Sequence, residues 1–161
     1  MPIRSLKAGR LTNFRLEAPS ADRITVRDNY TEGRVTLADP EVRFSLMQLT
    51  VGKVLQGVDV RAASSIHTVA AETMLRSRVV ASGSPSGLLG TAAASGNATQ
   101  RGAIVNLSVG GAFTDSFISA WRIGKVKLDS AGQDNPNRLF GLVYHRLRWY
   151  QGPANVDKTV V

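Results

Sequence analysis

The strongest constraint on the fold is an alternation of apolar and polar residues near the end of the chain. It is clearest in residues 138–150, where apolar side chains recur at alternate positions, the pattern of a β-strand with one buried face. The residues of this parity are Leu139, Gly141, Val143, His145, Leu147 and Trp149. We therefore expect residues 103–151 to form a β-meander on which the remainder of the chain packs.

The opposite parity of the same strand mixes charge with apolar bulk. Its residues are Arg138, Phe140, Leu142, Tyr144, Arg146 and Arg148. Large apolar side chains placed beside arginines are poorly suited to water alone. We expect this second face to contact a partner, and a second copy of the chain is the favoured one.

Residues 117–128 also alternate, but the parity of their apolar side chains changes across Gly124. Glycine favours a β-bulge because it tolerates positive φ and lets the strand bend. The connection that follows, residues 129–137, consists of turn formers and includes Pro136, which cannot donate a ladder hydrogen bond. These features predict a long hairpin with a protruding polar loop.

The length of 161 residues and the 43% hydrophobic content suit one domain with a real core. We expect an N-terminal arm at residues 1–19, a single β-rich domain at residues 20–151 and a C-terminal tail at residues 152–161. Within the domain, residues 23–27 and 34–37 read as short strands.

Two further segments are ambiguous between helix and strand. Residues 40–51 begin with Pro40 and Glu41 directly after Asp39, which is a helix-start signature. Residues 64–78 carry apolar side chains at helical spacing. Both segments also alternate or contain β-branched residues, so the strand interpretation stays open. The expected fold is mainly β, a β-barrel or sandwich with a long hairpin and one or two short helices.

Residues 82–102 form the other landmark of the sequence. They are almost all small and contain one charged residue, Arg101. A structureless loop of this length is uncommon in a compact domain unless it is functional. Because the segment also holds Leu88 and Leu89, we expect it to become ordered against a neighbouring subunit.

The composition argues against several kinds of chemistry. The chain has no cysteine and only two histidines, His67 and His145, which leaves thiolate chemistry absent and any metal site short of its usual ligands. The Gly-Ser segment lacks the lysine of a phosphate-binding loop. No spacing links either histidine to an acid. We expect no catalytic, cofactor or metal site, and hence a non-enzymatic protein.

A formal net charge of +8 predicts attraction to anionic partners. The charge is dispersed and forms no basic tail. Candidate interface residues on the strand face are Arg122, Tyr144, Arg146, Arg148 and Tyr150. They suit a subunit interface, since arginine and tyrosine are typical of protein–protein contacts. They also suit a nucleic-acid-binding β-module, which is the alternative function.

The hairpin at residues 117–150, the loop at 82–102 and the arm at 1–19 together resemble small virion proteins of tailed bacteriophages, of the tail-tube or capsid decoration type. The resemblance implies self-assembly into a ring, tube or lattice with other structural proteins of the same particle. It also implies a virion location after assembly in the host cytoplasm, and otherwise the protein is expected to be cytoplasmic. Tube lumens of that class tend to be acidic, so the basic residues would face outward. No apolar run reaches the roughly 20 residues that span a bilayer, so no membrane contact is expected.

Overall fold

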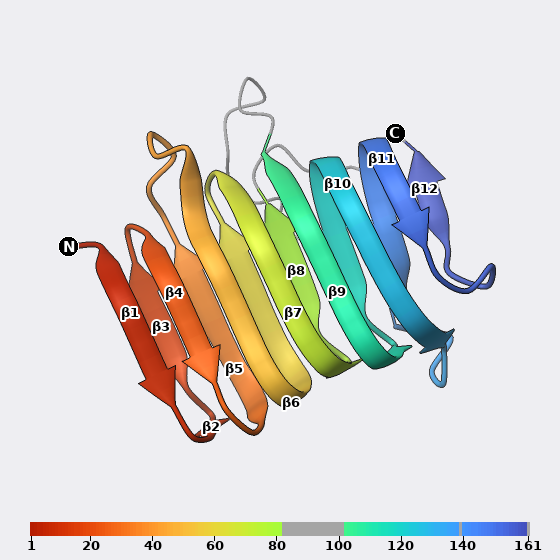
Figure 1. Ribbon diagram of the computed structural model, residues 1–161, viewed down its shortest axis with the longest axis horizontal. Coiled ribbons are helices and arrows are strands. Elements are labelled where there is room, and N and C mark those ends of the chain that lie inside the picture. The colour runs from red at the N-terminus through yellow and green to blue at the C-terminus, as the bar shows by residue number, and fades with distance from the viewer. Residues whose placement is uncertain (82–101, 139, 161) are drawn as a thin grey trace.

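The computed structural model describes residues 1–81, 102–138 and 140–160, and these form strands and no helix (Figure 1). Every strand pair is parallel. The strands are β1 (Ile3–Ala8), β2 (Leu11–Thr12), β3 (Arg15–Ala18), β4 (Ala21–Val26), β5 (Tyr30–Leu37), β6 (Phe44–Ala62), β7 (Ser65–Leu75), β8 (Arg78–Ala81), β9 (Ala103–Thr114), β10 (Phe117–Gly132), β11 (Gly141–Gln151) and β12 (Lys158–Val160). The predicted mainly-β class is confirmed.

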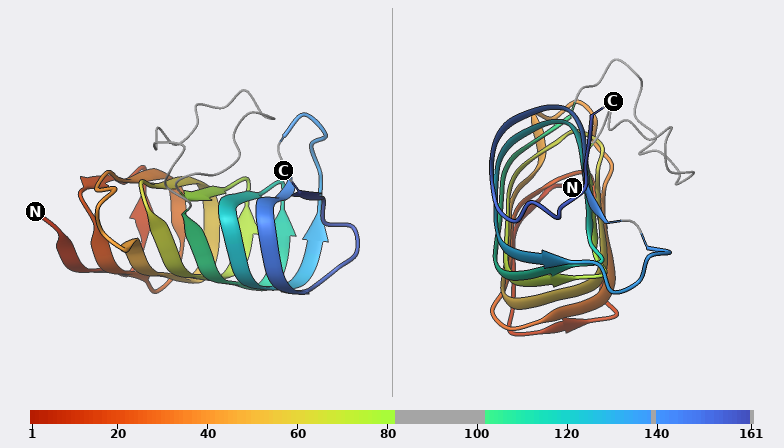
Figure 2. Two further views of the ribbon diagram at one scale, coloured as in Figure 1. Left: turned by 90° about the horizontal axis from the view of Figure 1, so that it is seen from above. Right: turned by 90° about the vertical axis from the view of Figure 1, so that its right-hand side faces the viewer.

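The chain winds into a flattened coil in which each turn stacks on the one before (Figure 2). The first coil is β1 to β3, and it pairs with the second coil, β4 and β5. Because β6 and β10 run round corners, they pair with neighbours on more than one side. Five strands, β6, β7, β9, β10 and β8, thereby close a ring of parallel pairs. The expected barrel is therefore present as a closed ring of parallel strand pairs.

The core consists of ladders of apolar side chains that stack from coil to coil. One ladder runs through residues paired from coil to coil, which are Leu6, Ile24, Leu49, Val69, Leu107, Val126 and Tyr150. Its five central members are fully buried. Burial of this kind supplies roughly 1.5–3 kcal/mol for each large side chain and is the main force that holds the coils together.

One corner of the coil repeats with the same backbone conformation. The residues there have φ between +45° and +63°, and they are Asn13, Glu32, Gly57, Arg76 and Asp115. Each directly follows a residue of one register column, Thr12, Thr31, Gln56, Leu75 and Thr114. A left-handed residue turns the strand sharply, so these five residues set the direction in which the first five coils return.

The expected one or two short helices are wrong, and the strand interpretation left open for both segments is correct. Residues 44–51 and 65–75 belong to β6 and β7, which are strands. Asp39 does accept a hydrogen bond from the amide of Glu41 at 2.9 Å, as a cap would. The chain then becomes extended, because as a strand it stacks the inward side chains of β6 on those of β4. Tertiary packing overrides the local helical preference.

The predicted hairpin is also wrong, since β10 and β11 pair in parallel. Residues 133–138 do not reverse the chain, which continues into β11 at the start of the next coil. Two hydrogen bonds hold this connection, from the amides of Asp134 and Asn135 to the carboxylate of the buried Asp115 at 2.9 and 3.1 Å.

The bulge predicted at Gly124 does not occur there. The shift in register between β9 and β10 lies at Leu128/Ser130 instead. A Cβ on Gly124 would overlap the main-chain oxygen of Val105, so the position needs glycine for close packing between coils.

The ends of the chain belong to the same sheet. Residues 3–18, expected as an arm, contain the strands of the first coil, and β12 of the expected tail pairs with β11. Of the predicted loop at 82–102, residues 82–101 lie outside the described residues, and so do Leu88 and Leu89. No helix among the described residues is long and apolar enough to cross a membrane.

Candidate functional site

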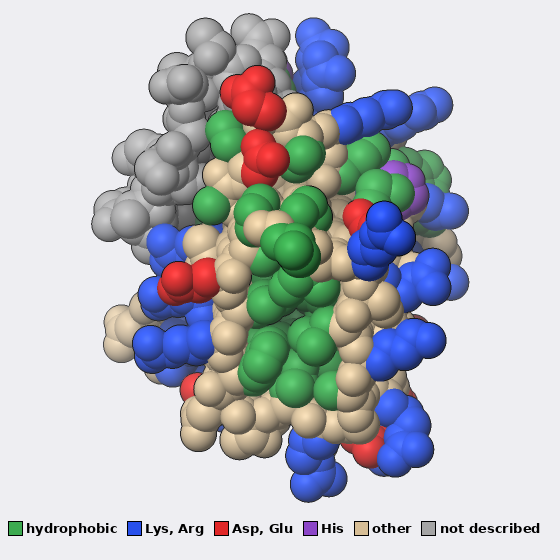
Figure 3. All heavy atoms as spheres, turned by 90° about the vertical axis from the view of Figure 1, so that its left-hand side faces the viewer, with side chains coloured by type: hydrophobic (Ala, Val, Ile, Leu, Met, Phe, Trp, Pro, Cys, Tyr) green, Lys and Arg blue, Asp and Glu red, His purple; other side chains and the backbone are tan. Residues whose placement is uncertain are grey.

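The N-terminal end of the coil leaves its apolar interior uncovered. The inward residues of the first coil are only half-buried, and they are Ile3, Leu6, Leu11, Phe14, Leu16 and Ala18. The inward residues of the second coil are fully buried, and they are Ala21, Ile24, Val26, Tyr30, Val35 and Leu37. Figure 3 shows the apolar side chains gathered in the middle of this end. We call the first coil's half-buried set the open end.

The backbone at the open end is uncovered too. Strands β1, β2 and β3 each pair on one side only, with β4 or β5. Such an edge presents unpaired amide and carbonyl groups to any strand that meets it.

The opposite end of the coil is covered by the chain itself. Between β11 and β12, the side chain of Val156 is buried with 3% exposed. The Tyr150 hydroxyl donates a hydrogen bond to the Pro153 carbonyl at 2.6 Å, and the Asn155 amide donates one to the Ala131 carbonyl at 2.9 Å. Among the described residues the two ends therefore differ, because the interior is covered around Val156 at this end and is half-exposed in the first coil.

Charge surrounds the open end. The first coil carries four cations and one carboxylate, and they are Arg4, Lys7, Arg10, Arg15 and Glu17. All five side chains are exposed. The apolar centre thus has a basic rim.

Tyr30 anchors the open end to the second coil. Its hydroxyl donates a hydrogen bond to the Phe14 carbonyl at 2.8 Å, and the two rings meet edge to face with centroids 6.4 Å apart. Burial raises the pKa of Tyr30 from 10.0 to about 12.

We expect Tyr30→Phe to lower the free energy of unfolding by about 1 kcal/mol at neutral pH, because the hydrogen bond is lost. It should also change the alkaline behaviour. The raised pKa stabilises the fold fully below pH 10, and this stability is lost as the pH rises from 10 towards 12. Urea unfolding across that range should therefore show a shallower alkaline decline in Tyr30→Phe. An unchanged decline would contradict this role of Tyr30.

A second surface lies on the outer sides of β10 and β11, and we call it the basic face. Its residues are Trp121, Arg122, Lys125, Lys127, His145, Arg146, Arg148 and Trp149. The register places Arg122 beside Arg146 and Lys125 beside Trp149.

Two aromatic contacts order the basic face. The rings of Trp121 and His145 stack with centroids 4.3 Å apart and an interplanar angle of 19°. The Lys125 ammonium lies over the Trp149 ring, 4.8 Å from its centroid, and 42% of Trp149 is exposed. Aromatic rings and cations therefore alternate across two neighbouring strands.

The cations of this face lack the carboxylates that accompany cations elsewhere. Residues 117–128 and 141–151 contain five arginines and lysines and no acid. In contrast, Arg34 and Arg61 lie 3.8 and 2.9 Å from the carboxylate of Asp59. Across the described ranges, none of these five arginines and lysines forms an ion pair with a carboxylate. Among the described residues, the two strands therefore present a patch of positive charge.

The sequence-predicted interface residues divide between surface and interior. Arg122, Arg146 and Arg148 lie together on the basic face. Tyr144 does not join them, since it is buried with 8% exposed. Tyr150 is half-buried, with its hydroxyl bonded to the Pro153 carbonyl.

Sequence reasoning missed five residues of the basic face, which are Trp121, Lys125, Lys127, His145 and Trp149. Trp149 was expected on the buried parity, but β11 bends between its buried first residues and its exposed second half. The sequence did hold a signal for these residues. Lysine, arginine and tryptophan are dense in residues 117–128 and 141–151, and neither segment contains an acid.

The two histidines lie on separate strands. His67, on β7, packs edge to face on Phe44 at 5.3 Å between centroids, whereas His145 stacks on Trp121. Strands β9 and β10 separate β7 from β11. No group of three histidines or acids among the described residues is placed to hold a metal ion.

Comparison with known proteins finds no matching family model, no significant match among curated proteins and none among solved structures.

Proposed function

We propose that this protein is a non-enzymatic structural component that self-associates, and that two copies meet through the open end. The observation that carries the proposal is the contrast between the first two coils. The same inward positions are buried where a coil covers them and half-exposed where none does. An apolar surface with free strand edges is a typical site of protein–protein contact.

The difference between the two ends selects the arrangement. A head-to-tail stack would place the open end against an end already covered around Val156. A two-fold arrangement covers both open ends at once, because the same patch is used on each copy. Strand β1 of one copy then lies antiparallel to strands of the other, and the free backbone groups can pair.

The basic rim makes the association sensitive to salt. Two open ends that meet bring the cations of both first coils together, and dissolved salt screens this repulsion. Dimerisation should therefore strengthen as salt rises from low to physiological concentration. The narrower expectation of a virion role rests on the resemblance alone. One of the three features of that resemblance, the hairpin, is absent, because β10 and β11 pair in parallel.

The first test replaces Leu6 and Leu16 with aspartate and measures molar mass by light scattering. Each replacement removes an apolar side chain from the interface, so the dissociation constant of the dimer should increase by at least about 100-fold. The matched control is Val160→Asp, at the opposite end, where 67% of the side chain is exposed. It should dimerise as the unmodified chain does. The open end would be excluded as the interface if the unmodified chain were monomeric. It would also be excluded if the doubly substituted leucine variant and Val160→Asp dimerised equally.

A second test does not depend on how well the leucine variant folds. The chain contains no cysteine, so a single introduced cysteine can form a disulfide only with another copy. Cysteine in place of Ser5, Thr12 or Glu17, one on each strand of the first coil, should give cross-linked dimers at one or more positions on oxidation. Val160→Cys should not. Cross-linking through Val160→Cys alone would point to the covered end instead.

A further inference from the structure

We propose that the basic face binds single-stranded nucleic acid, with the arginines and lysines on phosphates and Trp149 on a base. The site is built by the fold, since its two strands are separated by residues 133–140 in the chain and meet in parallel register. It lies on the outer side of the coil and is separate from the open end.

The first argument is charge complementarity. Five cations share two adjacent strands without a carboxylate, and strands of a sheet lie about 4.8 Å apart. Paired cations such as Arg122 and Arg146 therefore repel one another in the free protein. A polyanion relieves this repulsion and releases its own counterions on binding, which favours the complex.

The second argument is the position of the aromatic rings. Trp149 is partly exposed beside Lys125. Trp121 and His145 form a stacked pair four residues earlier on the same two strands. Stacking of bases on aromatic side chains is how proteins hold unpaired strands, and it is tolerant of sequence. A duplex keeps its bases inside the helix, so the aromatic residues favour a single strand over a double one.

The chain carries a built-in reporter for this test. Its two tryptophans, Trp121 and Trp149, both lie on the basic face. A base that stacks on the partly exposed ring of Trp149 quenches its fluorescence. Titration with an oligothymidylate of about 20 nucleotides should therefore quench intrinsic fluorescence, and the logarithm of the affinity should fall by about 3 for each tenfold rise in salt.

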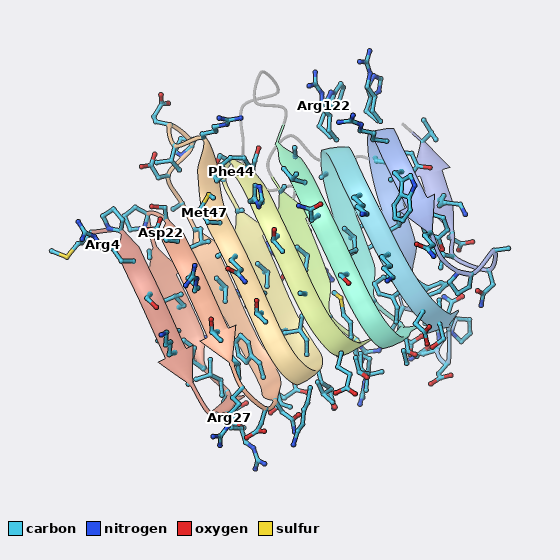
Figure 4. The ribbon with its side chains drawn as sticks, viewed as in Figure 1. Arg4, Asp22, Arg27, Phe44, Met47 and Arg122 are labelled. Carbon is cyan, nitrogen blue, oxygen red and sulfur yellow. The ribbon has the colours of Figure 1, made fainter. Side chains whose placement is uncertain are left out.

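Two variants separate phosphate contacts from stacking. Arg122→Ala with Arg146→Ala removes two cations and should lower the salt slope by about 1.4. Trp149→Ala keeps the charge and should weaken binding by about 5- to 100-fold. The charge-matched control is Arg23→Ala with Arg27→Ala, two exposed positions near β4. Figure 4 shows Arg27 at the lower edge and Arg122 at the upper edge of the molecule, so this control should bind as the unmodified chain does.

Three results would overturn the proposal. One is the absence of quenching by the oligothymidylate at low salt. Another is an equal loss of affinity in the two double-arginine variants, which would show attraction to net charge without a site. The third is binding of heparin or duplex DNA in preference to the single strand, which would assign the basic face to a different polyanion.

Discussion

Leu107→Ala should lower the free energy of unfolding by about 2–5 kcal/mol. Leu107 is 1% exposed and stands in the central ladder between Val69 and Val126. The coils above and below hold its neighbours in place, so the cavity cannot collapse easily. For a chain of this length the melting temperature should fall by roughly 4–20 °C, measured by circular dichroism.

The control for this prediction is the next residue along the strand. Ser108 is exposed on the outer side of β9, so Ser108→Ala should change the stability by no more than about 0.5 kcal/mol. If the two variants melted together, the assignment of inward and outward sides in β9 would be wrong. A one-residue error in register exchanges the two sides of a strand, so the pair of variants tests the register directly.

Gly52→Ala should be similarly damaging, with a loss of about 3 kcal/mol. A Cβ at this position would overlap the main-chain oxygen of Arg27 in the neighbouring coil. That oxygen belongs to the backbone and cannot rotate away as a flexible side chain can. The coils would have to separate locally, which would also strain the hydrogen bond from the Lys53 amide to the Asp28 carbonyl.

Gly110 provides a matched glycine in an open environment. It lies in β9, it is exposed, and a Cβ there would meet no atom within 4 Å. Gly110→Ala should leave stability unchanged or raise it by about 0.4–1 kcal/mol, because alanine restricts the unfolded chain. Equal urea midpoints for the two glycine variants would contradict the close approach of the coils at Gly52.

The sequence contains the repeat on which this fold is built, but insertions of unequal length make the repeat hard to detect. Each coil contains an inward residue, an outward one and another inward one, as in residues 24–26, 49–51, 107–109 and 126–128. The intervals between these triplets are unequal, because extra residues such as 38–43 and 82–101 separate the coils. A search for a fixed period therefore fails, whereas a search that allows insertions at the corners would have found it.

The candidate surfaces were predicted unequally. Arg122, Arg146 and Arg148 share a face because the parallel register aligns β10 with β11. The sequence analysis named the same arginines, but it placed them on an antiparallel hairpin. The predicted role of the N-terminal residues in association survives as a proposal. Its structural basis differs, since the apolar residues are the uncovered first coil of the core and not the contacts of a detached arm.

The sequence by itself determined that the chain is mainly extended, and it located inward positions such as Ile24 and Val26. Alternation with a period of two is a local property, so it can be read wherever a strand has one buried side. The direction and register of pairing were decided only by the tertiary structure. They depend on left-handed corners and on ladders that join residues far apart in the chain, as Leu49 joins Ile24 and Val69. No local pattern distinguishes a strand that meets the next coil from one that turns back on itself.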